Sequence, residues 1–224
     1  MTRRISGVVF DLDGTLVDSR ADIADATNYA LNHCGLPTLS EEEIGKFVGD
    51  GAKNLILRAA NVGADAAIVE PLLATFLDYY ASHACIKTTF MPGAREALDA
   101  LRPLPLALLT NKPRQPTVAL LDALRVRESF RHVIAGGDLA VMKPDPEPLL
   151  GIARRLDVEP SSLVMVGDGP QDIECGKAAG AWTVGVAGGI ADLDRLKASR
   201  PDRLIDSLRD LPDLLRGLVK IPAS

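Results

Sequence analysis

The chain is poor in cysteine and histidine and has no surplus of basic charge. Its three cysteines and three histidines are scattered among 224 residues, so we expect reduced thiols, no zinc site and no Ser-His-Asp triad. The 25 Lys and Arg residues are outnumbered by 30 Asp and Glu residues. A net charge of −5 does not favour a nucleic-acid partner.

Long apolar stretches are also missing. The longest runs, such as residues 106–109, are far shorter than the ~20 residues that cross a membrane. The residues between Arg4 and Asp11 are too few for the apolar part of a secretory signal. We therefore expect no membrane contact and a cytoplasmic location.

Short apolar segments alternate with helical patterns along most of the chain. Alternation of this kind is typical of an α/β fold in which helices cover both faces of a parallel sheet. The expected architecture is a three-layer, Rossmann-like core. The predicted strands are 7–10, 106–109, 132–135, 163–166 and 183–186, and the predicted helices are 114–125, 146–156 and 170–180.

The stretch from about residue 20 to residue 83 interrupts this alternation. It contains helical patterns at 20–34, 41–47, 52–61 and 66–82, and no convincing strand. We therefore predict an inserted all-helical cap domain over residues 17–87. The core domain is then formed by residues 1–16 and 88–224.

Ligands of parallel sheets bind beyond the carboxyl ends of the strands, so the polar residues there are the candidate site residues. Asp11 and Asp13 follow the first strand, and Gly14 and Thr15 come next. In an extended segment the two aspartates point to the same side, and a hard cation such as Mg²⁺ would offset their repulsion. The alternative is a simple Asp-Gly turn.

Further polar residues follow the later strands. Thr110 and Asn111 come after the second strand and could hydrogen-bond a phosphoryl oxygen, or simply cap a helix. Lys143 stands before Pro144 in a restricted loop, either as a fixed positive charge or as a solvated lysine. Together with acids after the fourth strand, these residues predict a site for a metal-bound phosphate.

The acids after the fourth strand are Asp168 and Asp172. Asp168 could be a metal ligand or a helix cap. Asp172 could be a second ligand, could orient Lys143, or could be exposed. The sequence alone leaves these alternatives open.

With these motifs, the sequence resembles the haloacid dehalogenase-like hydrolase superfamily with an alpha-helical cap. The resemblance is specific in Asp11 to Thr15 and in Gly167 to Asp172, and it extends over essentially the whole chain. Segments 10–19, 48–52, 109–113 and 143–146 look most like the phosphoglycolate phosphatase family. Similar proteins usually carry Ser or Thr where this chain has Gly169, so the effect of that glycine is left open.

The resemblance implies a phosphomonoesterase that forms an aspartyl-phosphate. Asp11 would be the nucleophile, and Asp13 the general acid and base. Mg²⁺ would be held by the carboxylates of Asp11 and Asp168 and by the backbone carbonyl of Asp13. Lys143 would supply positive charge to the phosphoryl group.

The resemblance also implies roles for the remaining polar residues. Thr110, Asn111 and Lys143 would bind the phosphate, while Gly14, Thr15 and Asp172 would support the site. The cap would contact the substrate through the segment that leads into a helix, where free backbone N–H groups attract anions. The candidate contacts there are Gly49, Asp50, Gly51 and Lys53, although Asp50 could cap the helix and Lys53 could be solvated.

The substrate implied is a small phosphorylated metabolite, first of all 2-phosphoglycolate, which would yield glycolate and phosphate. A sugar phosphate or pyrophosphate remains an alternative. A beta-phosphoglucomutase-like phosphomutase ranks lower, because Val48 and Ala52 stand where similar mutases carry basic residues. A non-catalytic phosphate-binding module is the last alternative. The sequence leaves open whether the protein is a monomer or a homodimer.

Overall fold

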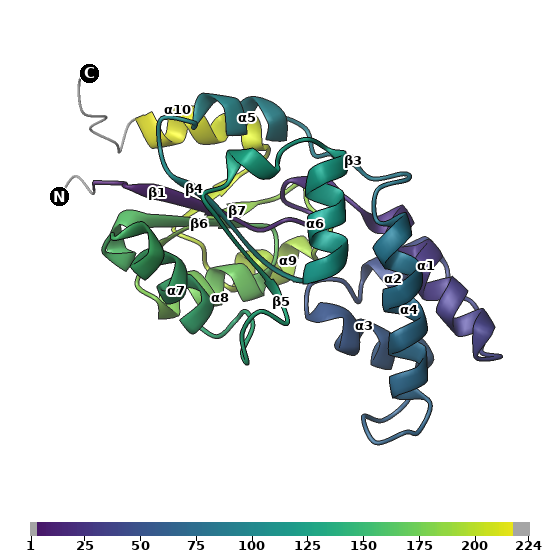
Figure 1. Cartoon of the computed structure of the whole chain (residues 1–224). Helices are drawn as coiled ribbons and strands as arrows, with labels where there is room; N and C mark the ends of the chain where they lie inside the picture. Colours follow the sequence, from purple (N-terminus) through teal and green to yellow (C-terminus); the bar gives the residue numbers. More distant parts are fainter. Residues whose placement is uncertain (1–3, 217–224) are drawn as a thin grey trace.

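A six-stranded parallel sheet forms the centre of the molecule (Figure 1). The computed structural model describes residues 4–216. The strand order is β5-β4-β1-β6-β7-β8, so the first strand lies in the middle of the sheet. The strands are β1 (Gly7–Phe10), β4 (Leu106–Pro113), β5 (His132–Gly136), β6 (Leu163–Gly167), β7 (Trp182–Val186) and β8 (Arg203–Ile205).

Helices cover both faces of the sheet, because the strands are apolar on both sides. Val8 and Phe10 of β1 pack into one hydrophobic cluster, and Val9 packs into another on the opposite face. The first face carries α5 (Ala94–Ala100), α6 (Arg114–Ala123) and α10 (Leu211–Arg216), and the second carries α7 (Glu147–Leu156) and α8 (Pro170–Ala178). Helix α9 (Leu193–Ala198) lies beside α8, and the 3-10 turns are Arg127–Ser129, Pro160–Ser162 and Leu208–Asp210. The predicted three-layer fold is confirmed.

Four helices lie between two short paired strands, β2 (Val17–Asp18) and β3 (Thr89–Phe90). They gather at one side of the core, beyond the carboxyl ends of the parallel strands (Figure 1). We call α1 to α4 the helical insert. Its members are α1 (Arg20–His33), α2 (Glu41–Gly45), α3 (Gly51–Ala60) and α4 (Val69–His83).

The division into domains at residues 17 and 87 stays a prediction. The predicted core also includes residues 1–3 and 217–224, which lie outside the described residues. The entrance and exit of the helical insert are fastened to each other. The carboxylate of Asp22 in α1 accepts hydrogen bonds from the backbone N–H groups of Ile86, Lys87 and Thr88 at 2.8–3.0 Å.

Three strands of the described part of the chain were not predicted from the sequence, and β4 was predicted four residues too short. Strands β2, β3 and β8 have two or three residues each, too few for an alternating pattern to stand out. Strand β4 continues beyond Leu109 to Pro113. Thr110 and Asn111 therefore belong to this strand rather than to the loop that follows it.

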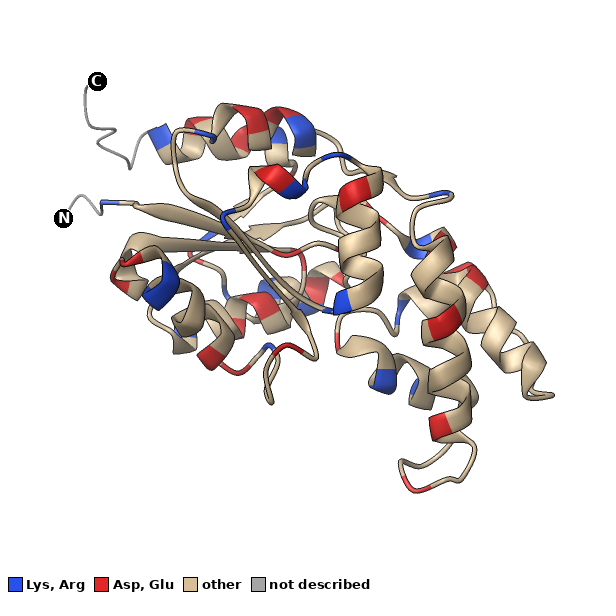
Figure 2. Ribbon diagram, in the orientation of Figure 1, with Lys and Arg blue, Asp and Glu red and all other residues tan. Residues whose placement is uncertain are grey.

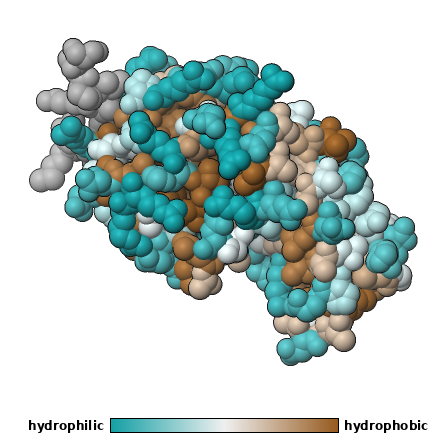
Figure 3. All heavy atoms as spheres, viewed as in Figure 1, coloured by the Kyte–Doolittle hydropathy of each residue, from teal (hydrophilic) through white to brown (hydrophobic). Residues whose placement is uncertain are grey.

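The surface mixes charge and apolar groups. In Figure 2, Lys and Arg residues are interspersed with Asp and Glu residues along the outer helices. Figure 3 shows hydrophilic side chains over most of the core, and more hydrophobic ones on the side of the helical insert. Within residues 4–216, no helix is both long and apolar enough to span a bilayer.

Candidate functional site

The carboxyl ends of the central strands bring together a buried lysine and two buried aspartates. Lys143 places its Nζ atom 2.7 Å from Oδ1 of Asp11, which follows β1, and 2.6 Å from Oδ1 of Asp172 in α8. All three side chains are at most 7% exposed. Of the roles that the sequence left open for Asp172, the contact with Lys143 is the one observed.

Asp168 lies at the end of β6 and is held by the backbone of a distant loop. Its Oδ2 accepts hydrogen bonds from the N–H groups of Ile190 and Ala191, at 2.8 and 2.9 Å. Its Oδ1 accepts one from the hydroxyl of Thr15 at 3.2 Å. Gly14 packs directly on this carboxylate, because a Cβ atom at residue 14 would lie 2.2 Å from Oδ2 of Asp168. Gly14 and Thr15 thus both contact the carboxylate of Asp168, and their supporting roles stay predictions.

A divalent cation fits this cluster of acids. Asp11, Asp168 and Asp172 each offer a carboxylate oxygen, and these oxygens lie within 4.8 Å of one another. Oxygen ligands of this kind suit a hard cation such as Mg²⁺. The carboxylate of Asp13 is engaged elsewhere, so its predicted part in metal binding would fall to its backbone carbonyl.

Burial shifts the titration of these acids. It raises the pKa of Asp11 to about 7, although Lys143 partly opposes the shift. Burial, followed by the charge of Asp11, raises the pKa of Asp168 to about 6. Burial also raises the pKa of Asp172. Burial alone would lower the pKa of Lys143, but Asp11 and Asp172 outweigh it and raise that pKa above its usual value. A bound cation would favour the ionised acids.

Asp13 belongs to a second cluster that the sequence did not reveal. Its Oδ1 accepts hydrogen bonds from the Ser19 hydroxyl at 2.6 Å and from Nζ of Lys112 at 2.9 Å. The Lys112 ammonium also donates to the hydroxyl of Tyr80 and lies 4.4 Å from the centre of that ring. A lysine directly after Thr110 and Asn111, at the end of an apolar strand, was the available signal for this cluster.

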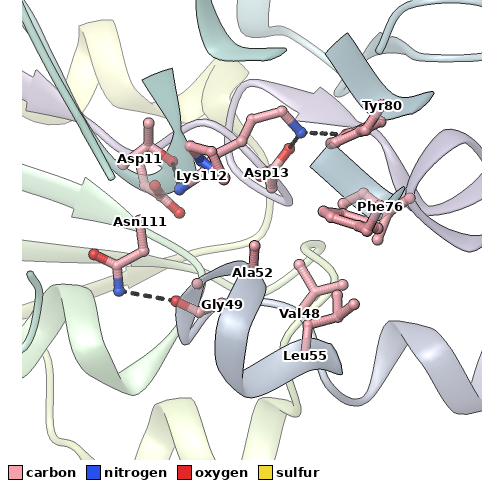
Figure 4. Close-up of a pocket in the computed structure, with 14 residues that line it drawn as sticks. Asp11, Asp13, Val48, Gly49, Ala52, Leu55, Phe76, Tyr80, Asn111 and Lys112 are labelled. Atoms are coloured by element: carbon pink, nitrogen blue, oxygen red, sulfur yellow. Dashed lines mark hydrogen bonds and ion pairs between the residues drawn. The ribbon is translucent and has the colours of Figure 1, made fainter. Parts of the chain in front are cut away.

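These residues open into a pocket between the core and the helical insert (Figure 4). The core supplies the polar part of the wall, with Asp11 and Asp13 on it. The helical insert supplies most of the apolar part. The lining residues are Asp11, Asp13, Ile23, Val48, Gly49, Gly51, Ala52, Leu55, Phe76, Tyr80, Thr110, Asn111, Lys112 and Pro113.

The side-chain amide of Asn111 is fully hydrogen-bonded to backbone groups on both sides of the site. Its Nδ2 donates to the carbonyl oxygens of Lys143 and Gly49 at 2.9 and 3.0 Å, and its Oδ1 accepts from the N–H of Lys143 at 3.0 Å. The hydroxyl oxygen of Thr110 accepts from the backbone N–H of Lys112 at 3.1 Å. A direct contact of Asn111 or Thr110 with phosphate stays a prediction.

The four residues predicted to form the cap contact divide into two pairs. Gly49 and Gly51 line the pocket. Asp50 and Lys53 are not among its lining residues, because Asp50 pairs with Arg58 at 2.5 Å and Lys53 pairs with Glu70 at 3.4 Å. Asp50 precedes α3 but makes no side-chain hydrogen bond that caps it.

Gly169 is the N-cap residue just before α8, and its conformation does not require a glycine. Its φ of −110° is accessible to any residue, and its N–H donates to Oδ2 of Asp172 at 3.0 Å. A Cβ atom there would meet the end of the flexible Gln171 side chain, at 2.3 Å. The backbone bond to Asp172 is therefore made without a hydroxyl at this position.

The model of the haloacid dehalogenase-like hydrolase family matches residues 8–186 of the chain. A phosphoglycolate phosphatase of Chromobacterium violaceum is 38% identical in an alignment of 221 positions, gaps included, that covers 96% of this chain and 98% of that protein. A phosphoglycolate phosphatase of Escherichia coli is 36% identical in an alignment of 229 positions, gaps included, that covers 92% of this chain and 91% of that protein.

Solved structures of phosphatases are similar to this chain as well. The crystal structure of a predicted phosphoglycolate phosphatase from Haemophilus somnus has a TM-score of 0.88 and 30% sequence identity, and the match covers 94% of this chain and 98% of that one. A putative phosphoglycolate phosphatase from Lactobacillus delbrueckii has a TM-score of 0.85 and 25% identity, over 95% and 98% of the two chains. The chain therefore belongs to the haloacid dehalogenase-like hydrolase family, and within it the protein is a phosphatase, a phosphoric monoester hydrolase.

Proposed function

We propose that this phosphatase hydrolyses 2-phosphoglycolate to glycolate and phosphate through an aspartyl-phosphate on Asp11. The observation that carries the substrate is the likeness to relatives named phosphoglycolate phosphatase, which extends over nearly the whole chain at 36–39% identity. The observation that supports the chemistry is the position of Asp11 and Asp13 on the wall of one pocket.

In the first half of the reaction, a carboxylate oxygen of Asp11 attacks phosphorus and the ester P–O bond breaks. Asp13 gives a proton to the departing oxygen, which leaves as the hydroxyl of glycolate. Lys143 supports this step because its ammonium lies 2.7 Å from Oδ1 of Asp11 and adds positive charge beside the incoming phosphoryl group.

In the second half, Asp13 takes a proton from a water molecule as that water attacks the phosphorus of the aspartyl-phosphate. The bond between phosphorus and the Asp11 oxygen breaks, and inorganic phosphate and the free carboxylate result. Ser19 holds Asp13 for both steps through its 2.6 Å hydrogen bond to Oδ1.

Asp11 and Asp168 would hold Mg²⁺, with Asp172 close to both. When bound, the cation supplies charge neutralisation, which lets an anionic nucleophile approach an anionic phosphate. A requirement for a cation fits the charges of the site, because three buried aspartates surround one buried lysine, Lys143.

Phosphate release from a panel of phosphomonoesters in the presence of Mg²⁺ tests the proposal. The panel includes 2-phosphoglycolate and several sugar phosphates, pyrophosphate is tested beside them as a phosphoanhydride, and Asp11→Asn serves as the blank. We expect 2-phosphoglycolate to lead by about tenfold or more in kcat/KM, or ~1.4 kcal/mol of transition-state preference. A sugar phosphate in the lead would refute the substrate, and turnover by Asp11→Asn at the wild-type rate would refute the mechanism.

A further inference from the structure

Lys112 gives the pocket a positive charge at the end where the leaving group of the substrate must lie. Among the described residues that line the pocket, it is the only lysine or arginine. Its side chain is 2% exposed, whereas the lysines of the helical insert that form ion pairs, Lys46 and Lys53, are more than half exposed. A buried ammonium is stable only with anionic or polar partners. The groups around Lys112 therefore indicate which part of a substrate it can bind.

The contacts of Lys112 fix its ammonium between the core and the helical insert (Figure 4). On the core side, Nζ lies 2.9 Å from Oδ1 of Asp13. On the insert side it meets the hydroxyl and the ring face of Tyr80, a buried residue of α4. The ammonium is therefore held at the boundary where a substrate enclosed by both parts would have its non-phosphate end.

Orienting Asp13 does not by itself account for this lysine. The hydroxyl of Ser19 donates to the same Oδ1 atom of Asp13 at a shorter distance, 2.6 Å against 2.9 Å. Asp13 would thus keep a hydrogen-bond donor if the ammonium turned to another anion. Beyond Lys112, the wall on the insert side is formed by apolar side chains such as Val48, Leu55 and Phe76. These side chains offer no competing partner to a charged group.

We infer that Lys112 determines specificity by binding a carboxylate on the leaving group of the substrate, an inference that rests on the proposed function. In 2-phosphoglycolate the carboxylate carbon is two bonds from the ester oxygen that Asp13 protonates. A group beside Asp13 is therefore within reach of that carboxylate. Because Lys112 is 2% exposed and apolar side chains of the helical insert form part of the pocket wall, the attraction between its ammonium and a carboxylate is stronger there than in water.

The experiment compares two substrates that differ in this group alone. Ethyl phosphate carries a methyl group where 2-phosphoglycolate carries its carboxylate. Both are assayed with the wild type and with Lys112→Met, which keeps the length of the side chain and removes its charge. We expect the preference for 2-phosphoglycolate, taken as the ratio of the two kcat/KM values, to fall by about 100-fold, as for truncation of one partner of a buried charge pair. The value for ethyl phosphate should fall as well, because Nζ of Lys112 also bonds Asp13, so the test is the ratio of the two values and not either value alone.

The controls separate charge recognition from folding. Lys46→Met removes an exposed lysine of the helical insert that pairs with Glu42, and it should leave both values as in the wild type. Lys112→Arg retains the charge and should retain more of the preference than Lys112→Met. Thermal unfolding shows whether each variant folds. If Lys112→Met does not fold, Lys112→Gln takes its place.

Equal losses on the two substrates in Lys112→Met would overturn the inference, because they would show that the lysine acts only through Asp13. That result would leave the proposed function standing. A wild type with no preference for 2-phosphoglycolate over ethyl phosphate would instead refute the proposed function and the inference together.

Discussion

The side-chain amide of Asn111 donates a hydrogen bond of 3.0 Å to the carbonyl oxygen of Gly49, which ties the end of strand β4 to the loop that precedes α3. The same side chain makes two hydrogen bonds to the backbone of Lys143, one with its N–H and one with its carbonyl. One buried amide thus links the position of the helical insert to the position of the lysine that contacts Asp11.

Replacing Asn111 with alanine should destabilise the protein and weaken catalysis together. Two buried backbone groups of Lys143 would lose their partner, so we expect a loss of about 2–4 kcal/mol in the free energy of unfolding. For a chain of this size the melting temperature should fall by roughly 5–10 °C. Thermal unfolding and steady-state kinetics measure the two effects. Asn54→Ala is the matched control, because that amide is exposed and donates to the carbonyl oxygen of Asp50, only four residues before it. An Asn111→Ala protein as stable as Asn54→Ala would contradict the role of this link.

The raised pKa values of Asp11 and Asp168 make stability and metal binding depend on pH in opposite directions. The folded pKa values, about 7 and about 6, lie above the value of 3.8 for an exposed aspartate. The contribution of these groups to the stability of the metal-free protein is therefore fully present below pH 3.8 and is lost as pH rises through 6 and 7. Mg²⁺ binding, which needs the ionised acids, should strengthen over the same range.

Calorimetric titration of Mg²⁺ into the protein at pH 6 and pH 8 measures this effect. We expect the dissociation constant to be about 10- to 20-fold lower at pH 8, because the protons of the two acids must leave before the cation binds. Asp168→Asn should weaken binding at both pH values, since one ionisable ligand is lost. Equal dissociation constants at pH 6 and pH 8 would show that the acids are already ionised in the metal-free protein.

The convergence of Asp11, Lys143 and Asp168 could be predicted because it follows from topology. In a parallel sheet the carboxyl ends of all strands lie at one edge, so residues that follow different strands meet there whatever their separation in sequence. The pairing of Lys143 with Asp172 was also among the predicted alternatives. This pairing is expected on electrostatic grounds, because Asp11, Asp172 and Lys143 are buried in contact and the lysine offsets the charge of the acids.

The residues that depend on how the helical insert packs could not be predicted in the same way. Lys112 acquires its partner Tyr80 only because α4 lies against the end of β4. Asp50 and Lys53 turn to Arg58 and Glu70 instead of to the pocket, which depends on the rotation of α3 about its axis. Local sequence patterns carry the period of a helix but not its orientation against a neighbouring unit.

Asp22 holds the two connections of the helical insert together, and its removal should loosen them. Its carboxylate accepts hydrogen bonds from three successive backbone N–H groups, those of residues 86–88, and from the hydroxyl of Thr88 at 2.6 Å. In Asp22→Ala these donors lose their acceptor, so we expect a loss of about 2–4 kcal/mol in the free energy of unfolding.

Urea denaturation of Asp22→Ala and of Asp25→Ala measures this difference. Asp25 lies on the same helix and pairs with Lys87 at 2.6 Å, but its side chain is 46% exposed. Exposed ion pairs contribute little, so Asp25→Ala should cost less than about 1 kcal/mol. Asp22→Asn, which keeps one acceptor oxygen, should fall between the two. Similar losses in Asp22→Ala and Asp25→Ala would mean that the buried contacts do not hold the connections together.

Alanine substitutions at Gly14 and at Gly35 distinguish the effect of backbone strain from the effect of crowding at the metal site. Both glycines have a positive φ, 85° and 72°, so alanine should cost each about 1–2 kcal/mol of backbone strain. A Cβ atom at Gly35 would have no neighbour within 4 Å among residues 4–216, whereas one at Gly14 would lie 2.2 Å from Oδ2 of Asp168. Gly14→Ala must therefore displace a carboxylate that is held by two backbone N–H groups, and we expect it to lower stability further and to weaken Mg²⁺ binding at least about tenfold. Gly35→Ala should bind Mg²⁺ as the wild type does. If Gly14→Ala also bound Mg²⁺ normally, Asp168 would not be a ligand of the cation.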